Sequence, residues 1–378
     1  MTQHKGFGII AALVALNLGA CASANAHPSV TAATSPPQSA QPTVTPPSPT
    51  ATPFPPTAFQ PDGLSAISDS DFWVMGTQAC AATCRVEVLH TVNGGSTFER
   101  IPAPPVDYVS GSTNPGGPPS VFGIRFADES DGWVFGDSLW ATHDAGADWV
   151  HVNPLTGVTQ LEPGANGYVY AVFEVCPPFS PCKFQLMRSL WGINTWTAIV
   201  PPGSPAGLPV IGVHGDTLWV MYFQRSTPLE WISHDDGRTF VRGSMPCEPD
   251  LDGSFDPVSN SVIWSFCATG TEGGALVSTS GGTTFSAVPR PVGEFSNAGS
   301  VAAVSALTAF IFDPLDGMKV TTNGGRTYGD IHELDGAVWA GFTDAEVGYV
   351  IVNEQPKGAV RLWRTSDAGA EWSIVSLP

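Results

Sequence analysis

Basic residues are scarce in this sequence, which holds 15 Lys and Arg against 34 Asp and Glu. Proteins that bind nucleic acid neutralise phosphates with clustered Lys and Arg, so the net charge of −19 excludes nucleic acid as an expected partner. Charged residues of either sign make up only 13% of the chain. The excess of acid indicates a soluble surface kept apart by like charge, and by itself it identifies no ligand.

A long apolar run is also missing. The most apolar run, from Phe7 to Leu18, is too short for an ordinary membrane-spanning helix. It leads into Leu-Gly-Ala-Cys at residues 18–21, which resembles the signal of bacterial lipoproteins. The resemblance implies cleavage before Cys21, lipidation of its thiol, and a mature protein anchored to the cell membrane on its extracytoplasmic side. An ordinary secretory signal cut after Ala26, or an uncleaved anchor, is the alternative.

The segment that follows the signal lacks core-forming residues. From about residue 27 to residue 60 it is almost wholly Pro, Thr, Ser, Ala and Gln. Such a composition cannot bury a core and predicts a solvated stalk, partly extended as polyproline II. We therefore divide the chain into a lipoprotein signal peptide at 1–20, a disordered Pro/Thr/Ser-rich linker at 21–58 and a folded domain at 59–378.

Unpaired cysteines are not expected in the folded domain. Apart from Cys21 the number of cysteines is even, which in an exported chain favours disulfides over metal ligands. Close spacing favours sequential pairing. The predicted pairs are Cys80 with Cys84, Cys176 with Cys182, and Cys247 with Cys267. A zinc site at the first pair lacks a second nearby Cys or His pair.

Turn formers and large aromatics are abundant instead, with 41 Gly, 35 Pro and 12 Trp. This profile is typical of all-β folds, and long helices are not expected. Hydrophobic residues make up 42% of the 378, enough for a sizeable core.

One turn motif recurs along the folded domain, with the pattern Ser/Thr-x-Asp/Asn-x-Gly-x-Thr-aromatic. Six copies are clear and a degenerate seventh occupies residues 189–196, and the closing aromatics are 43 to 51 residues apart. Asp or Asn can bond backbone N–H groups two residues on, Gly supplies a positive φ, and the aromatic re-enters the sheet with a large buried area. The residues at these structural positions are Asn93, Gly95, Phe98, Asp144, Gly146, Trp149, Trp196, Asp235, Gly237, Phe240, Ser280, Gly282, Phe285, Asn323, Gly325, Tyr328, Asp367, Gly369 and Trp372.

Further strand patterns precede each motif, most clearly at 120–126 and 132–136 before the second copy and at 338–342 and 348–352 before the last. With the strands that flank the turn, each unit has four strands. A four-stranded unit of about 45 residues has the size of a propeller blade, and blades stacked around an axis leave only short protected edges. The sequence therefore predicts an all-β, seven-bladed β-propeller of four-stranded blades.

The turn motif resembles the Asp-box (BNR) repeat of sialidases, of sortilin-type receptors and of photosystem II assembly and stability factors. The phrase Phe-x-Asp-(x)₃-Gly-aromatic, at 126–133 and 342–349, looks most like the assembly factors. The resemblance covers the whole folded domain and implies the propeller. It implies no single function, because these relatives include hydrolases, receptors and assembly factors.

A catalytic constellation is missing from the sequence. Sialidase chemistry needs three arginines around a carboxylate, a Tyr activated by a Glu, and an Asp. Arg100-Ile101-Pro102 matches the family's arginine phrase but follows the first turn motif, whereas the family's phrase precedes it. Other glycoside hydrolases need two facing carboxylates. The acids considered are Asp128, Glu129, Asp131 and Asp344, for which turn formation is the favoured interpretation.

Histidine and metal chemistry give no stronger signal. His143, His214 and His234 have no Ser or Cys partner in a recognisable nucleophile motif. The turn motifs gather Asp, Asn and Gly as calcium loops do, but they lack the alternating carboxylates and the distal Glu of an EF-hand. No catalytic residue, cofactor or metal ligand is predicted.

A rigid disc with variable loops is suited to binding. We expect the loop of each blade's first hairpin and the loop between blades to share the face opposite the turn motifs, where 77–86, 104–119 and 176–183 are elaborated. Disulfides and prolines there would either lower the ordering cost of a binding surface or protect loops from proteolysis. The expected protein is a non-catalytic cell-envelope lipoprotein that binds a protein or peptide, or assists assembly. The alternative is a glycan-binding module or a sialidase-like exo-glycosidase acting on extracellular carbohydrate.

Overall fold

The computed structural model describes residues 59–78, 84–108, 120–176, 182–205, 207–223, 228–248, 251–269, 272–288, 299–313, 317–354 and 358–378. The predicted signal, the linker and Cys21 lie outside them. The described residues form strands and one 3-10 helix, η1 (His332–Leu334). No helix in this part of the chain is long and apolar enough to cross a membrane.

The strands pair in antiparallel runs of four, each of which we call a blade. Five blades are separate sheets. They are β10 (Val158–Pro163), β11 (Tyr168–Val175), β12 (Lys183–Leu190) and β13 (Thr197–Ile199); β14 (Pro209–His214), β15 (Thr217–Tyr222), β16 (Leu229–Ser233) and β17 (Val241–Arg242); β18 (Asp252–Pro257), β19 (Ile263–Thr269), β20 (Glu272–Ser278) and β21 (Ser286–Ala287); β22 (Ser300–Ala303), β23 (Ala309–Asp313), β24 (Gly317–Thr321) and β25 (Gly329–Asp330); and β26 (Ala337–Phe342), β27 (Gly348–Glu354), β28 (Ala359–Thr365) and β29 (Ser373–Val375).

The remaining strands form one nine-stranded sheet. It contains β1 (Phe59–Ala66), β2 (Phe72–Gln78), β3 (Cys84–Thr91) and β4 (Glu99–Ile101), then β6 (Ser120–Phe126), β7 (Gly132–Gly136), β8 (Ser138–Thr142) and β9 (Val150–Thr156). The short β5 (Asp107–Tyr108) joins the two runs, since it pairs with both β3 and β6.

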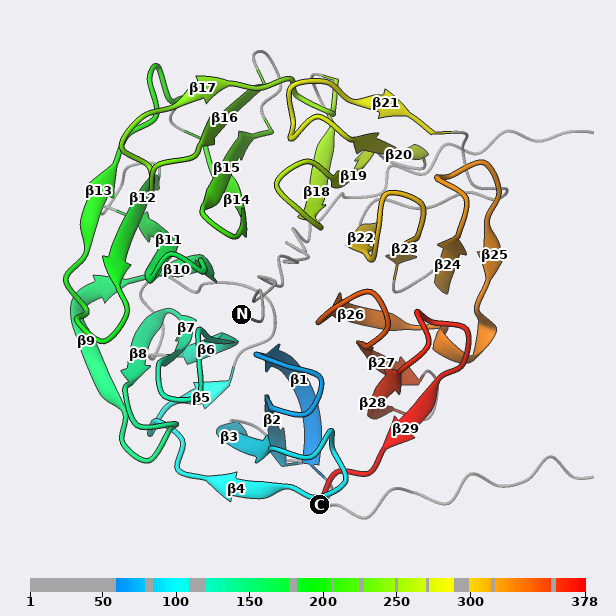
Figure 1. Ribbon diagram of the computed structural model, residues 1–378. Coiled ribbons are helices and arrows are strands. Elements are labelled where there is room, and N and C mark those ends of the chain that lie inside the picture. The colour runs from blue at the N-terminus through cyan, green and yellow to red at the C-terminus, as the bar shows by residue number, and fades with distance from the viewer. Residues whose placement is uncertain are drawn as a thin grey trace, which may run out of the picture.

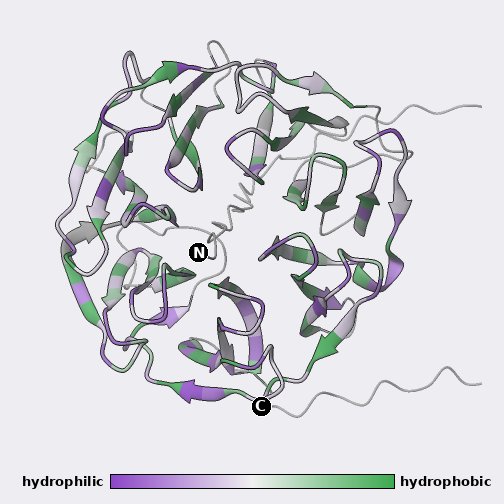
Figure 2. Cartoon of the chain, viewed as in Figure 1, coloured by the Kyte–Doolittle hydropathy of each residue, from purple (hydrophilic) through white to green (hydrophobic). Residues whose placement is uncertain are grey.

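The blades stand around a central axis like the sectors of a disc (Figure 1). The first strand of each blade is innermost and the fourth lies at the rim, as β14 and β17 show. Hydrophobic residues concentrate on the strands, and the connecting turns are more hydrophilic (Figure 2). The protein is therefore a β-propeller, as the sequence predicted.

One aromatic residue is buried at an equivalent place on the second strand of every blade. It directly follows the residue that pairs with the first Ser or Thr of the turn motif, as Trp219 follows Leu218, the partner of Ser233. These residues are Trp73, Trp133, Tyr170, Trp219, Trp264, Phe310 and Tyr349. Each is at most 1% exposed.

Each of these aromatics packs across a seam between blades. The partner is the closing aromatic of the next blade's turn motif, as with Trp219 and Phe285 or Phe310 and Trp372. The rings of Phe310 and Trp372 meet edge to face, with centroids 5.9 Å apart. Every hydrophobic cluster of the described residues spans two neighbouring blades in this way. The core is thus distributed among the seams.

The ring closes by the same packing, and no strand of the described residues is exchanged between the first and last blades. β1–β4 and β26–β29 are each built from one end of the folded chain. Their seam holds Phe72 against Tyr349, with ring centroids 4.8 Å apart, and the Tyr349 hydroxyl donates to the Asp69 carbonyl at 3.1 Å. Phe98, the closing aromatic of the first turn motif, packs against this cluster.

The turn motif is held by a small hydrogen-bond network. The Ser233 hydroxyl donates to Asp235 Oδ1 (2.9 Å) and accepts the Gly237 N–H (2.8 Å). Thr239 donates its hydroxyl to Asp235 Oδ2 (2.7 Å) and its N–H to Oδ1 (2.8 Å). These bonds from Thr239 lower the pKa of Asp235 to about 2. Bonds of this kind recur around Asn93, Asp144, Ser280, Asn323 and Asp367.

The turn motif also contacts the turn of its own blade's first hairpin. The residue before the motif glycine is left-handed, including Ala145 and Ala368 at φ of 63° and 60°. Its N–H donates to a carbonyl of the first-hairpin turn, at 3.0 Å from Ala145 to Ser130 and 2.8 Å from Ala368 to Glu346. Both kinds of turn therefore share one face of the disc, which we call the motif face.

The expectation that first-hairpin loops lie opposite the turn motifs is wrong. Connections in an antiparallel run alternate between its two ends, so the first and third connections of a blade share a face. The elaborated segments 77–86 and 176–183 join second to third strands, and 104–119 joins blades. The described ends of these segments lie away from the motif face, and residues 79–83, 109–119 and 177–181 lie outside the described part.

Substituting a motif glycine tests how tightly a turn fits its neighbouring blade. A Cβ at Gly369, where φ is 87°, would lie 2.2 Å from Phe310 Cζ. We expect Gly369→Ala to lower the free energy of unfolding by roughly 2–5 kcal/mol, through left-handed strain and overpacking together. Gly167→Ala is the control, because φ is 82° there and no atom lies within 4 Å of the added Cβ. It should lose only about 1–2 kcal/mol in denaturant unfolding. Equal losses of stability in the two variants would contradict the close packing of Gly369 against Phe310.

Candidate functional site

A pocket of about 590 Å³ opens on the motif face. It is lined by the first-hairpin turns of three neighbouring blades, β10–β11, β14–β15 and β18–β19. The lining residues are Ala165, Asn166, His214, Gly215, Asp216, Ser259, Asn260 and Ser261. We call this pocket the notch.

The notch follows from one short turn. Only Gly215 and Asp216 join β14 to β15. The flanking turns, 164–168 and 258–262, are longer, and each is closed by a backbone bond from its first N–H to its last carbonyl, at 2.8 and 2.9 Å. The short turn leaves a gap between its taller neighbours. The Ala165 N–H donates to the Gly215 carbonyl at 2.9 Å and fixes one wall against the floor.

Polar groups line the floor of the notch. The exposed carboxylate of Asp216 receives only long hydrogen bonds, from Asn260 Nδ2 at 3.4 Å and from the Thr217 hydroxyl at 3.5 Å. The Thr217 hydroxyl also lies 3.0 Å from His234 Nδ1. His214 is buried below, with 6% exposed. Of the histidines considered from the sequence, His214 lines the notch, whereas His234 contacts Thr217 and is not among the lining residues. No catalytic role was predicted for either.

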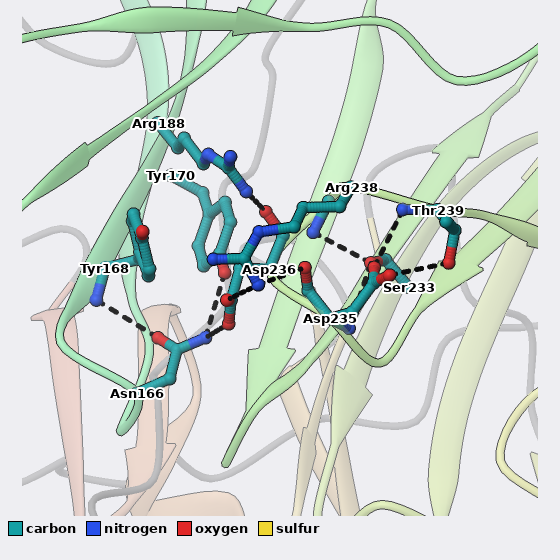
Figure 3. A network of polar contacts seen from close by, with 10 residues as sticks. Asn166, Tyr168, Tyr170, Arg188, Ser233, Asp235, Asp236, Arg238 and Thr239 are labelled. Carbon is teal, nitrogen blue, oxygen red and sulfur yellow. Dashed lines mark hydrogen bonds and ion pairs between the residues drawn. The ribbon is translucent and has the colours of Figure 1, made fainter.

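Asn166 anchors the wall of the notch on the β10–β11 side (Figure 3). Its Nδ2 donates to Asp236 Oδ1 at 2.6 Å and to the Tyr170 hydroxyl at 3.0 Å, and its Oδ1 accepts the Tyr168 N–H at 3.1 Å. Burial raises the pKa of Tyr170 to about 12, so its phenol stays protonated. The wall is consequently fixed before any ligand arrives.

One arginine pairs with the carboxylate of Asp236 on the far side of Asn166, and a second bonds its backbone carbonyl (Figure 3). Arg238 Nη1 lies 2.7 Å from Asp236 Oδ2, and Arg188 Nη1 donates to the Asp236 carbonyl. The guanidinium of Arg188 also stands over the Tyr168 ring, 5.0 Å from its centroid. These arginines complete a structural network between two blades.

The degenerate turn motif at 189–196 borders the same region. Trp191 occupies the place of the motif Asp, and its Nε1 donates to the Tyr168 carbonyl at 2.9 Å. Leu190 and Ile193 are exposed by 43% and 57%. Asn194 has a φ of 52° and bonds His143 Nε2 at 2.9 Å, while His143 Nδ1 lies 2.5 Å from Asp131 Oδ1. The motif face is thus most irregular around β10–β19.

The predicted acids are mostly turn residues. Asp128 Oδ1 accepts the N–H groups of Ser130 and Asp131 at 2.8 and 2.7 Å, and Asp344 Oδ1 accepts two N–H groups of its own turn at 2.6 and 2.7 Å. Glu129 is exposed. None of these acids lines the notch.

The arginines are dispersed. Those that form ion pairs among the described residues have separate acidic partners, and no three of them share one carboxylate. The pairs are Arg100 with Glu87, Arg125 with Glu162, Arg238 with Asp236, and Arg361 with Glu354.

The cysteines form disulfides where both partners are described. Cys176 is bonded to Cys182, and Cys247 to Cys267, which is the predicted sequential pairing. Cys84 is also disulfide-bonded, but its predicted partner Cys80 lies outside the described residues. Glu174 lies near the first pair, where three possible metal ligands gather. Sulfurs bonded to each other are not thiolates, so this cluster offers only one carboxylate.

Buried carboxyl groups with raised pKa values often mark functional sites. Burial raises the pKa of Asp62 on β1 to about 7, of Glu162 on β10 to about 7, and of Glu230 on β16 to about 9. Glu162 is paired with Arg125, whose Nη2 lies 3.2 Å from Oε1. The Tyr108 side chain is hydrogen-bonded to Asp62. The three acids belong to three different blades and do not form a pair.

Glu230 differs in polarity from the residues at the equivalent position of the other blades. Other blades have an apolar residue three positions before the motif Ser or Thr, and Ile or Val three positions after the closing aromatic, where this blade has Gly243. A Cβ at Gly243 would lie 2.6 Å from Glu230 Cδ, and one at Gly282 would lie 2.5 Å from Oε1. Both carboxyl oxygens are buried without a hydrogen-bond partner. Glu230 therefore fills a space between two glycines in a seam.

This carboxyl should make stability depend on pH. Its folded pKa of about 9 is above the ordinary 4.5, so the folded state keeps a proton that the unfolded state releases. The free energy of unfolding should fall as pH rises from about 5 to about 9. Glu230→Gln should flatten this fall, and Glu230→Leu should raise the unfolding temperature by about 2 °C or more near pH 8. The exposed Glu129→Gln should change neither, and an unchanged slope in Glu230→Gln would refute the role.

Four-stranded blades around an axis, aromatic seams and a preformed polar notch define a β-propeller with a small site on one face. No family model matches the chain, and no curated protein matches it. Similar solved structures include YCF48 from Cyanidioschyzon merolae, with a TM-score of 0.54, 15% identity, and coverage of 84% of this chain and 98% of that one. YCF48 bound to a D1 peptide has a TM-score of 0.52 and 14% identity, with coverage of 82% and 94%.

A puromycin-hydrolyzing peptidase of Mycobacterium tuberculosis has a TM-score of 0.58 and 10% identity. The match covers 85% of this chain but only 53% of the peptidase. At these identities the similarities show the propeller fold alone.

Proposed function

We propose that this chain is a non-catalytic binding module that presents a propeller to a protein or peptide partner in the cell envelope. The observation that carries the proposal is the notch, a polar pocket fixed between the first-hairpin turns of three blades. Binding pockets commonly combine preformed concavity with a few convergent polar groups. The fold shared with YCF48, one structure of which holds a D1 peptide, supports a peptide as the kind of partner.

The proposed propeller has seven blades of the Asp-box type over residues 59–378. The nine-stranded sheet divides at β5 into two blades, and the other five sheets supply one blade each. The hydrogen bonds around Asp235 and its equivalents support the likeness to Asp-boxes. The finer likeness to assembly factors or sortilin-type receptors rests on the motif phrases alone.

The proposed location is the extracytoplasmic side of the cell membrane. Residues 18–21 and the apolar run before them support lipidation of Cys21, and the Pro-rich composition of 21–58 supports a stalk. Two described disulfides fit an oxidising compartment. The lipid would hold the propeller near the membrane while leaving the motif face free to bind.

A glycan-binding module or an exo-glycosidase is the second candidate. Asp216, Asn260 and two serines in the notch could bind sugar hydroxyls, which favours a glycan. The dispersed arginines argue against sialidase chemistry. The raised pKa of Asp62, on an innermost strand, leaves one carboxyl to examine as a catalytic acid.

Two assays on the purified full chain separate these functions. We expect no turnover of aryl glycosides or sialosides, because the ion-paired arginines of the described residues are dispersed and the buried acids Asp62, Glu162 and Glu230 lie on three different blades. We expect a random-peptide display library to yield binders that compete with one another. Turnover that disappears in Asp62→Asn but persists in Glu129→Gln would overturn the binding-only proposal. A library that yields no binder would overturn the peptide proposal.

A further inference from the structure

The notch holds a negative charge that has no counter-ion, and this charge indicates which ligands the notch can accept. Asp216 is exposed at the floor and has no ion pair to Lys or Arg among the described residues. Asp236, on the other side of Asn166, is neutralised by Arg238 at 2.7 Å. The carboxylate that faces the open volume is thus left without a counter-ion, whereas the neighbouring carboxylate in the wall has one.

The other groups of the notch favour a donor-rich ligand. The Ser261 hydroxyl and the Asn260 amide oxygen can accept hydrogen bonds beside Asp216, whereas the Ser259 hydroxyl already accepts the N–H groups of its own turn. Ala165 contributes only a methyl group and Gly215 has no side chain, so a long aliphatic stem meets no bulky group there. An ammonium group offers three donors and a guanidinium offers five, with no acceptor that would oppose the carboxylate.

The charge of the whole chain acts in the same direction. With 34 acidic and 15 basic residues, the chain attracts cationic partners and repels anionic ones. The notch is less suited to a divalent cation. It supplies a single carboxylate, whereas a calcium site needs several oxygen ligands.

We propose that the notch is a specificity pocket for a lysine or arginine side chain of a peptide partner, with the Asp216 carboxylate as its counter-ion. The proposal rests on the proposed peptide-binding function. The short β14–β15 turn makes the pocket, and its two longer neighbours set the walls between which the cationic side chain enters.

A small probe tests the pocket directly. N-acetyl-lysine N-methylamide is titrated into the full chain at low salt and followed by amide chemical shifts, beside the norleucine counterpart that lacks the ammonium group. Shifts should concentrate at residues 164–167, 214–217 and 259–261 and weaken as salt screens the exposed charge. Asp216→Asn should reduce lysine affinity about tenfold, the loss of one charge-assisted contact. Glu129→Gln, an exposed acid in another first-hairpin turn, should leave affinity unchanged.

A second variant keeps the Asp216 carboxylate and fills the volume of the notch. Ala165→Phe leaves Asp216 in place but fills the exposed wall, and it should abolish the shifts. Equal binding of the norleucine probe, unchanged affinity in Asp216→Asn, or no binding of the lysine probe would overturn the proposal. Library peptides that bind without enrichment of Lys or Arg would also overturn it, while leaving peptide binding intact. A library with no binders would instead refute the proposed function itself.

Discussion

A buried aromatic side chain that packs across each seam is the interaction on which the rest of this structure depends. Trp219 illustrates it, since its ring lies in the cluster that Phe285 closes and its Nε1 donates to the Gly281 carbonyl at 2.9 Å. The side chain thereby joins the second strand of one blade to the turn motif of the next. Because no blade has a closed core of its own, the seams must all form for the ring to be stable.

The same arrangement leaves the first-hairpin turns free to vary. Their backbone bonds run to the turn motif of the same blade, as from Gly94 to Ser70 at 2.9 Å, and the seam aromatics lie beneath them. A turn can then be shortened without loss of the seam below. The β14–β15 turn shows this, because Trp219 stays fully buried under the notch. A local change in chain length thus becomes a pocket on an otherwise regular face.

The sequence predicted the propeller because the chemistry of the turn motif is local. Ser233, Asp235 and Gly237 lie within five residues of one another, so their spacing alone specifies the turn. The notch was not predicted, since it joins three turns distant in the sequence, although a strand-by-strand comparison could have shown that Gly215 and Asp216 form a shorter turn than the others. The first-hairpin turns were expected on the face opposite the turn motifs, but connections in an antiparallel run alternate between its ends, so these turns share the face of the motifs. Aligning the repeats would also have exposed Glu230, the one acid at an otherwise apolar position.

The seam that holds Glu230 combines several departures from the repeat. Its hydrophobic cluster has only Trp219, Met221, Ile232, Phe255 and Ile263 as buried members, the fewest of any cluster in the described residues. The Cys247–Cys267 disulfide crosses this seam from the connection after β17 to the strand β19. A disulfide stabilises the folded state mainly by restricting the unfolded chain, so it offsets weak packing without occupying core volume. The notch lies over this seam and the preceding one. The blade β14–β17, which has the weakly packed seam and the short first-hairpin turn, is therefore also the blade that forms the floor of the notch.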